Sequence, residues 1–439
     1  MGNNTNLVIH NPLQLESISH GISEFPSYVS IPYEKAELVD HYLKNVVGIQ
    51  ARSPLTGETH LCWPTYLQYL LADASIRDLI LESMQRSPTA LDAACMLSSL
   101  HKYALNVGAP TVDPETDHRF RQLSKALVTK PHLNEGDALA GLHCVSYVLF
   151  SGGRGKWQDF LKVACRYSDG ILWHPQYRGP QDALMRCSNT TRFIIKTSMW
   201  FDVLASATRV EIPYFLDVYR HMFSPEVARI EDPSTDLPEQ LSMLSIMGCE
   251  NHIVWALAEI SNLACWKEAQ KRDGALSTVE LVKRGAHIEQ FLMPGTTRQV
   301  NYFDNDEKRE NRILTSEVFR ASARVYLHSV LSGNYPSCKE IADGVEDTIR
   351  CLERVPERGS RSVVRSVVFS ICICGCLTDI QWQRKFLLER LEAQGTRETV
   401  GNCIEVKRLM SKVWNNRAMH NYDTITWRDV MRSTEMLLV

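Results

Sequence analysis

Three cysteines lie close together in the most apolar stretch of the sequence, at Cys372, Cys374 and Cys376. On a helix, Cys372 and Cys376 share one face, whereas Cys374 points about 160° away, so the three thiols cannot bind one metal ion. Structural zinc sites need four ligands, commonly supplied by close cysteine pairs, and the chain contains no Cys-x-x-Cys pair. We therefore predict buried, unreactive thiols here, with a redox or metal-binding role as the alternative.

A glycine-rich segment, Ser-Gly-Gly-Arg-Gly-Lys-Trp at residues 151–157, superficially resembles a phosphate-binding loop. A P-loop requires a glycine five residues before its second glycine and a serine or threonine after the lysine. Phe150 and Trp157 occupy those two positions, and no strand is predicted before them. The segment is instead predicted to be a flexible loop between two helices.

Motifs of hydrolytic enzymes are absent from the sequence. None of the 14 histidines belongs to a His-Glu-x-x-His or His-x-x-x-His pattern, and no Gly-x-Ser-x-Gly elbow occurs. We therefore predict that the chain is not an enzyme, and we assign no catalytic, cofactor-binding or metal-binding residue and no cofactor. A helical active site of a new kind is the alternative, which no motif supports.

One polar face has the composition of a binding surface. In the predicted helix 250–271, Trp255, Glu259, Asn262 and Trp266 lie opposite an aliphatic stripe. Two tryptophans on such a face can line a ligand cleft or a partner surface. Their commoner role is to pack against a second layer of helices, and both interpretations stay open.

The elements that must position these residues are predicted to be helices arranged around one centre. The stretch 311–391 divides into four helical segments, of which the third, 363–377, is apolar on almost every side. Because a helix without a polar face belongs inside a domain, we expect segment 363–377 to form the centre of the fold.

Several helix starts are predicted from capping residues. Thr315 and Ser316 precede the apolar-periodic run of the first segment in the stretch 311–391, which makes them candidate N-terminal caps. Three further serines or threonines precede a glutamate or glutamine by three residues, the spacing of a capping box. These pairs are Ser277–Glu280, Ser337–Glu340 and Thr378–Gln381.

The remaining helices are predicted from apolar periodicity. They cover residues 34–47, 63–107 with breaks near 73–75 and at 87–88, 115–130, 135–150, 156–167, 190–208, 214–221, 250–271, 277–293, 399–414 and 426–437. Residues 169–187 are predicted to be irregular, and the polar stretch 294–312 to be a surface loop or a frayed helix start. With no alternating strand pattern, the fold class is all-α, a large irregular multi-helix bundle. It comprises residues 34–439 and follows a polar tail or linker at 1–33.

Charge and cysteine usage restrict the partners. The chain has 48 Lys and Arg against 51 Asp and Glu, a net charge of −3, and no basic run longer than two residues. Such a chain is not expected to hold duplex DNA by itself. Thirteen cysteines and an N-terminus without signal-peptide character predict a reducing, intracellular location. The longest apolar run, 367–377, is far shorter than the roughly 20 residues of a membrane span, so no membrane partner is expected.

A series of short motifs resembles one known family. The stretch contains, in order, Arg-Ala-Ser-Ala-Arg-Val-Tyr-Leu at 320–327, a Tyr-Pro turn, the cysteine-rich helix entering Leu-Thr-Asp, a helix with Gln-Arg, and Val413-Trp414. Upstream, Lys156-Trp157-x-x-Phe160-Leu161 and Met247-Gly248-Cys249 fit the same pattern. From about residue 61 onward the chain resembles the C-terminal regulatory domain of fungal Zn2Cys6 transcription factors, the fungal-specific transcription factor domain of the sterol- and arginine-regulator type.

This resemblance implies a nuclear transcription regulator that contacts the transcription machinery and controls a metabolic or biosynthetic gene cluster. In the sterol-regulator branch the domain binds a small apolar effector between helices. The family also implies an N-terminal cluster of six cysteines around zinc, but the first cysteine here is Cys62 and nothing near it fits. Promoter DNA would then be reached only through a missing DNA-binding module or one supplied by a partner. The alternative is a non-DNA-binding interaction protein that dimerises with a full-length relative; a homodimer or heterodimer is compatible with either role.

Overall fold

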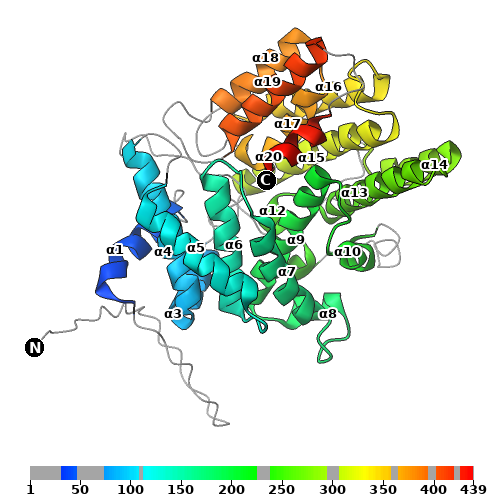
Figure 1. Ribbon diagram of the computed structural model, residues 1–439. Coiled ribbons are helices and arrows are strands. Elements are labelled where there is room, and N and C mark those ends of the chain that lie inside the picture. Colours follow the sequence, from blue (N-terminus) through cyan, green and yellow to red (C-terminus); the bar gives the residue numbers. More distant parts are fainter. Residues whose placement is uncertain are drawn as a thin grey trace, which may run out of the picture.

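The computed structural model of the chain describes eight stretches of the sequence. They are residues 31–46, 74–107, 112–224, 238–293, 306–356, 364–393, 402–419 and 426–438. Regular structure in these stretches is helical, with one isolated β-bridge between Arg154 and Met436 and no β-strand among the described residues. The all-α class and the multi-helix architecture are confirmed (Figure 1).

The described residues form the following helices in chain order. They are α1 (Tyr33–His41), η1 (Tyr42–Val46), α3 (Ala74–Arg86), α4 (Pro88–Val107), α5 (Pro114–Thr129), α6 (Glu135–Phe150), α7 (Gln158–Leu172), α8 (Pro180–Arg186), α9 (Asn189–Arg209), α10 (Leu216–Phe223), η2 (Glu239–Leu241), α12 (Leu244–Met247), α13 (Asn251–Arg272), α14 (Thr278–Glu289), α15 (Asp306–Leu331), α16 (Lys339–Glu353), η3 (Val364–Val367), α17 (Val368–Cys376), α18 (Gln381–Glu392), α19 (Cys403–Met419) and α20 (Trp427–Thr434).

The predicted central segment does lie inside the molecule. All nine residues of α17 are buried, and α17 packs against α15, α16, α18 and α19 (Figure 1). Its start differs from the prediction, because Val364–Val367 forms the 3-10 turn η3 before the α-helix begins at Val368. A helix surrounded on every side has no solvated face to supply polar residues, which explains its composition.

A second packed group forms the N-terminal half. Helices α4, α6, α7 and α9 pack against one another in chain order, and every residue of α6 from Gly136 to Phe150 is buried. Helix α9 also contacts α13 and α20, so it joins this group to the C-terminal half. The two halves share one continuous apolar core.

The start of α15, the longest of the described helices, was predicted too far along the chain. Helix α15 begins at Asp306, well before Thr315. The Thr315 hydroxyl donates a hydrogen bond to the carbonyl of Asn311 over 2.9 Å, which satisfies it within the helix and removes the reason to treat it as a cap. Residues 306–312 are therefore helical, in agreement with the second of the two alternatives for 294–312. Residues 294–305 lie outside the described chain.

Of the three predicted capping pairs, one is formed as an N-cap. Ser277 accepts a hydrogen bond from the backbone N–H of Glu280 at 3.2 Å and caps α14. The other two predictions were wrong, because α16 and α18 begin one and two residues later, with Cys338 and Ile380 at the N-cap and no side-chain cap. Spacing alone does not fix the residue at which the backbone enters the helix.

The segment 169–187 is more regular than predicted. Helix α7 continues through it to Leu172, and α8 occupies Pro180–Arg186. Pro180 stands at the first helical position, where a missing N–H is tolerated, so the proline starts this helix. The predicted tail 1–33 and the boundary at residue 34 stay predictions, because residues 1–30 are outside the described chain.

Candidate functional site

The predicted polar face of α13 lines a groove formed with α10 and α14. The groove has a volume of about 500 Å³. Its lining residues are Arg220, Ser224, Trp255, Glu259, Asn262, Leu263, Glu280, Lys283, Arg284, His287 and Ile288. Three of the four residues singled out on this face, Trp255, Glu259 and Asn262, contribute to the lining. Helix α14, which forms the far wall, projects at the edge of the molecule (Figure 1).

Both tryptophans of this face pack against α14, which agrees with the second-layer interpretation. Trp255 is buried and meets the rings of His287 and Phe291 edge-on, with centroids 6.0 and 5.5 Å away. Trp266 lies beneath the guanidinium of Arg284, 4.3 Å from the ring centroid, a cation–π contact. The tryptophans thus hold the wall of the groove, and the polar residues beside them face its interior.

The groove lining contains charged side chains of both signs. Arg220 on α10 binds Glu259 on α13 through both guanidinium edge nitrogens, with Nη2–Oε2 at 3.0 Å, and this bond raises the pKa of Arg220. Arg284 donates to Glu280 one turn earlier on α14 at 2.7 Å, which lowers the pKa of Glu280. With Lys283 exposed on the same helix, the lining carries three cations and two carboxylates. Such a lining suits an acidic or polar occupant better than an apolar one.

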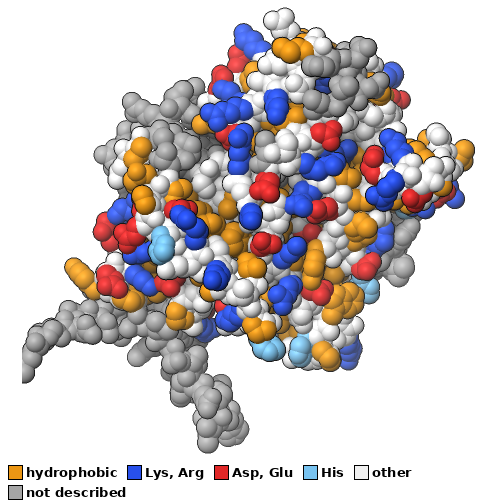
Figure 2. Space-filling model, viewed as in Figure 1, with side chains coloured by type: hydrophobic (Ala, Val, Ile, Leu, Met, Phe, Trp, Pro, Cys, Tyr) orange, Lys and Arg blue, Asp and Glu red, His pale blue; other side chains and the backbone are white. Residues whose placement is uncertain are grey.

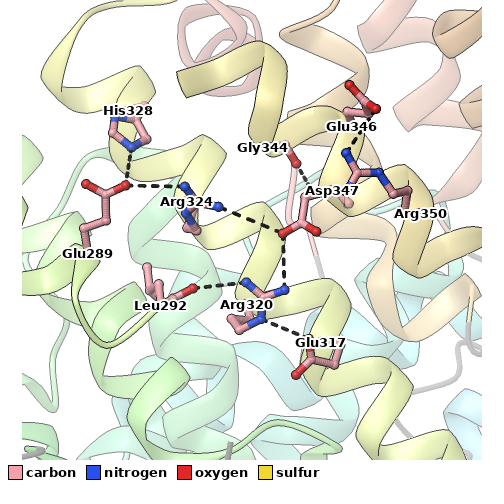
Figure 3. Close-up of polar contacts among 11 residues, drawn as sticks. Glu289, Leu292, Glu317, Arg320, Arg324, His328, Gly344, Glu346, Asp347 and Arg350 are labelled. Atoms are coloured by element: carbon pink, nitrogen blue, oxygen red, sulfur yellow. Dashed lines mark hydrogen bonds and ion pairs between the residues drawn. The ribbon is translucent and has the colours of Figure 1, made fainter. Parts of the chain in front are cut away.

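A buried arginine anchors the segment that follows α14. The side chain of Arg320 on α15 is 2% exposed. Its Nε donates to Glu317 at 3.0 Å, Nη1 to the carbonyl of Leu292 at 3.1 Å and Nη2 to Asp347 at 3.2 Å (Figure 3). Although burial opposes the charge, the two carboxylates raise the pKa of Arg320. Every nitrogen of this guanidinium has a partner, as a buried charge requires.

The same network continues to the last residue of α14. Glu289 accepts a hydrogen bond from His328 Nε2 at 2.8 Å and lies 3.6 Å from Arg324 Nη2. Arg324 in turn lies 4.0 Å from Asp347 on α16, which completes a chain of alternating charges (Figure 3). Because this chain links α14 to α15 and α16, it fixes the position of the helix that forms the groove wall.

The cysteines of α17 are buried, as predicted. The Cys372 thiol is hydrogen-bonded to Cys376, whereas Cys374 bonds separately to Thr348 on α16. Burial raises the pKa of Cys374 to about 12, and the bond to Cys376 together with burial raises the pKa of Cys372 well above its usual value. Thiols held in the protonated form are poor nucleophiles. Within the described residues, no three His, Cys, Asp or Glu side chains are placed to share a metal ion.

The glycine-rich segment 151–157 does connect two helices, but it is fixed rather than flexible. The N–H of Leu437 donates to the Gly153 carbonyl at 2.9 Å, and Trp157 Nε1 donates to the Glu435 carbonyl at 3.0 Å. Gly152, Gly153 and Gly155 have φ angles of 107°, 77° and 135°, which explains the need for glycine. The segment is a docking point for residues 435–437, not a phosphate site.

Sequence reasoning missed Arg220 and the α14 side chains of the groove. They come from helices that are separate from α13 along the chain, so helical periodicity within α13 could not find them. The signal that was present is the Glu280–Arg284 spacing, which places opposite charges one turn apart.

The described helices include none that combines the length and apolarity needed to cross a bilayer. On the face shown in Figure 2, Lys and Arg side chains are mixed with Asp and Glu, with no broad area of one sign. The mixture of charges on this face agrees with the net charge of −3.

Comparison with known proteins places these features in a family. A family model described as the fungal specific transcription factor domain matches residues 37–439. The chain is 26% identical over 196 residues to the trichothecene biosynthesis transcription regulator TRI10 of Fusarium sporotrichioides, covering 45% of this chain and 44% of that protein. It is 24% identical over 229 residues to the ustiloxin B cluster transcription factor ustR of Aspergillus flavus, covering 50% and 36%. It is 26% identical over 255 residues to the transcription factor dibT of Pestalotiopsis microspora, covering 54% and 38%.

Each match spans less than half of the relative's own length, and no solved structure matches the chain. The family match, by contrast, extends from α1 through the end of the described chain, including the central helix α17 and the arginine network of α15. The resemblance first suggested by the motifs at 320–327 and around the cysteine-rich helix is confirmed over almost the whole sequence. The chain therefore belongs to the fungal-specific transcription factor domain family.

Proposed function

We propose that the chain is the regulatory part of a transcription regulator that controls a biosynthetic gene cluster and has no enzymatic activity. The observation that carries this proposal is the family match over residues 37–439. It is supported by relatives that are named as regulators of trichothecene biosynthesis and of the ustiloxin B cluster. Such a protein works in the nucleus and contacts the transcription machinery.

Promoter DNA, in this proposal, is contacted by a zinc-cluster module outside these helices or by a partner that carries one. A net charge of −3 and a surface of mixed charges leave little to neutralise phosphates. In this arrangement the helical domain regulates transcription, and the DNA-binding module selects the promoter sequence.

The groove between α10, α13 and α14 is the surface we assign to a partner protein. Its lining of three cations and two carboxylates fits an acidic segment of a component of the transcription machinery. It does not fit the apolar effector that the sterol-regulator branch implies, because burying these charges under an apolar molecule would cost free energy.

The test is a reporter assay with residues 34–439 fused to an unrelated DNA-binding module. We expect the fusion to change reporter output under at least one nutrient condition. Lys283→Glu, in the groove, should reduce that change, whereas Lys385→Glu, an exposed lysine on α18 paired with Glu389, should leave it intact. A fusion that is silent under every condition would contradict the regulatory role.

The second candidate is an interaction protein that dimerises with a full-length relative and does not bind DNA. The net charge of −3, with no basic run longer than two residues, favours it. A gel-shift with the unfused chain, with and without a co-expressed relative, separates the two roles. Sequence-specific binding by the chain alone would exclude the second candidate.

A further inference from the structure

Three histidines lie where the first described helices, α1 and η1, meet the N-terminal packed group. Residues 33–46 pack on α4 at the edge of the molecule (Figure 1). His41 Nε2 lies 2.8 Å from Nδ1 of His101 on α4. The hydroxyl of Tyr42, the next residue, lies 2.6 Å from Nε2 of His143 on α6. Consecutive residues of the α1–η1 segment therefore bond to two different helices of the packed group.

The bond between Tyr42 and His143 requires a neutral imidazole in its present direction. Nδ1 of His143 lies 2.7 Å from the carbonyl oxygen of Leu139, which can only accept, so Nδ1 carries the proton and donates. Nε2 of the neutral ring then accepts from the Tyr42 hydroxyl. His143 is buried, so a second proton on Nε2 would reverse this bond and place a full charge in the interior.

The bond between His41 and His101 also limits the charge that the interface can hold. A hydrogen bond between two ring nitrogens contains one proton, so one ring donates and the other accepts. The two ring centroids are 5.0 Å apart, and His101 is buried. Protonation of both facing nitrogens would remove the acceptor and bring two like charges into contact. The docked pair is therefore incompatible with two protonated rings.

Charged side chains of α1, η1 and α4 lie around His41. Lys102 on α4 pairs with Glu37 on α1. Asp40, which precedes His41, pairs with Lys44 on η1 at 2.7 Å. Burial and Lys102 lower the pKa of His41 to about 4, although the two carboxylates act in the opposite direction. Both carboxylates are paired with lysines, and they do not keep this ring charged.

The two deeper histidines titrate below their ordinary range for the same main reason. Burial and the neighbouring His41 lower the pKa of His101 to about 3. Burial lowers the pKa of His143 to about 4, against the effect of its bond to the Leu139 carbonyl. Helices α3 and α5 also pack on α4, and their charged side chains include the ion pairs Glu82–Arg86, Glu115–Arg119 and Asp117–Arg121.

We propose that the α1–η1 segment is a pH-sensitive element, which docks on α4 and α6 while the three histidines are neutral and dissociates when they bind protons. Released histidines have a pKa of about 6.5, above the pKa of each docked ring. The docked state therefore binds fewer protons, so docking is strongest above pH 6.5 and weakens as the pH falls toward 4. Uptake of two protons, by His41 and His101, weakens docking by up to about a hundredfold per pH unit.

The regulatory meaning of this release rests on the proposed function. Because α1 is the first described helix, a DNA-binding module that precedes it in the chain would be held close to the domain in the docked state. Dissociation of residues 33–46 would lengthen the connection between the two. Dissociation itself does not depend on such a module and can be measured on the isolated chain.

The test is hydrogen–deuterium exchange of the purified chain between pH 7.5 and pH 5.5, corrected for the intrinsic exchange rate at each pH. We expect the protection of residues 33–46 to fall by about a hundredfold over this range. The protection of α9, residues 189–209, should persist. Equal loss of protection in α9 would show global acid unfolding and would overturn the proposal, as would unchanged protection of residues 33–46.

Variants identify the titrating groups. In the double variant His41→Gln and His101→Asn, amide groups replace the facing ring nitrogens and cannot titrate, so the change in protection should shrink to about tenfold, the share of His143. His118→Gln, at an exposed histidine of α5, is the matched control and should keep the full change.

Circular dichroism at pH 7.5 shows whether each variant folds, and the single variant His101→Asn, expected to remove about a tenfold share, serves if the double variant does not. A hundredfold change that persists without His41 and His101 would contradict their role. None of these measurements uses the reporter assay, so failure here leaves the proposed function standing.

Discussion

Arg320 and Arg428 are both buried arginines, but their surroundings differ in kind. Arg320 donates to two carboxylates and one carbonyl, and the structure around it is complete. Arg428 stacks on two aromatic rings, and two of its nitrogens donate to nothing in the described chain. Burial alone therefore does not determine the role of an arginine. A guanidinium with all its donors used stabilises the fold through its ion pairs, whereas a buried guanidinium with two unused donors costs stability.

Lys196 is intermediate between these two cases. It is 1% exposed on α9, and its ammonium donates to the carbonyls of Glu239 and Ser242 at 3.1 and 2.7 Å. Carbonyl oxygens satisfy hydrogen bonds but supply no full negative charge, and burial lowers the pKa of Lys196 to about 7. The three buried cations therefore differ in how far their charge is compensated. Arg320 has carboxylate partners, Lys196 has only carbonyl acceptors, and Arg428 has two nitrogens without a hydrogen-bond partner in the described chain.

The largest expected effect comes from a buried charge with no partner of any kind. Val368, 1% exposed at the start of α17, belongs to the hydrophobic core. Val368→Asp should cost several kcal/mol, comparable to the total stability, so the chain should unfold or aggregate. Thermal unfolding followed by circular dichroism measures it, with Val368→Ala as the control for lost volume. Equal melting temperatures for wild type and Val368→Asp would show that α17 is not the centre of the fold.

The next largest effect is expected from the loss of Arg320, the cation of the buried ion-pair network. Arg320→Met leaves Glu317 and Asp347 without their main partner and should lower the free energy of unfolding by about 3 kcal/mol. Urea unfolding of the variant measures this, and Arg350→Met is the control, because Arg350 is an exposed partner of Glu346 on α16 whose loss should cost about 0.5 kcal/mol or less. Similar losses for the two variants would contradict this role of Arg320.

Lys196 predicts a pH dependence of stability. Because its pKa is about 7 in the folded chain and 10.5 in the reference state, the unfolded chain binds more protons between these values. Folding is therefore penalised in full below pH 7, and the penalty is relieved as pH rises toward 10. Between pH 7 and pH 9 this group should add about 2 kcal/mol of stability. Urea unfolding of wild type and Lys196→Met at both pH values isolates the contribution, and a difference that is constant with pH would refute it.

The smallest effect is expected at Arg428. Arg428→Met removes a buried charge with unused donors, so stability should not fall and should rise by up to about 1 kcal/mol. The lost cation–π contacts offset part of this gain. Melting temperatures of Arg428→Met and of the control Arg432→Met make the comparison. A loss as large as that of Arg320→Met would place Arg428 in the same structural class as Arg320.

The sequence predicted the fold class and the central helix because both depend on composition over many residues. Helix α6 was predicted with its observed ends, 135 and 150, since loops rich in polar residues and glycine bound its apolar run. Boundaries that depend on one hydroxyl were less reliable. Thr315 looks like a cap in sequence, yet its hydroxyl bonds inside α15, and nothing local distinguishes the two outcomes.

The candidate sites also differ in how far the sequence could predict them. Periodicity within one helix placed Trp255, Glu259 and Asn262 on a common face, and they do line the groove. No such pattern could show that His41 and His101, 60 positions apart in the sequence, share a hydrogen bond. Their bond joins two helices that are separate along the chain, so only the assembled structure can reveal it.

The docking of residues 435–437 on the loop at 151–157 has a consequence for the order of folding. The bond from Trp157 to Glu435 joins positions separated by 278 residues. During synthesis on the ribosome, the loop at 151–157 therefore lacks its contacts with residues 435–437 until 278 further residues have been made. Contacts of such long range form late. Since α20 precedes the docking segment, it should be among the last parts of the domain to form.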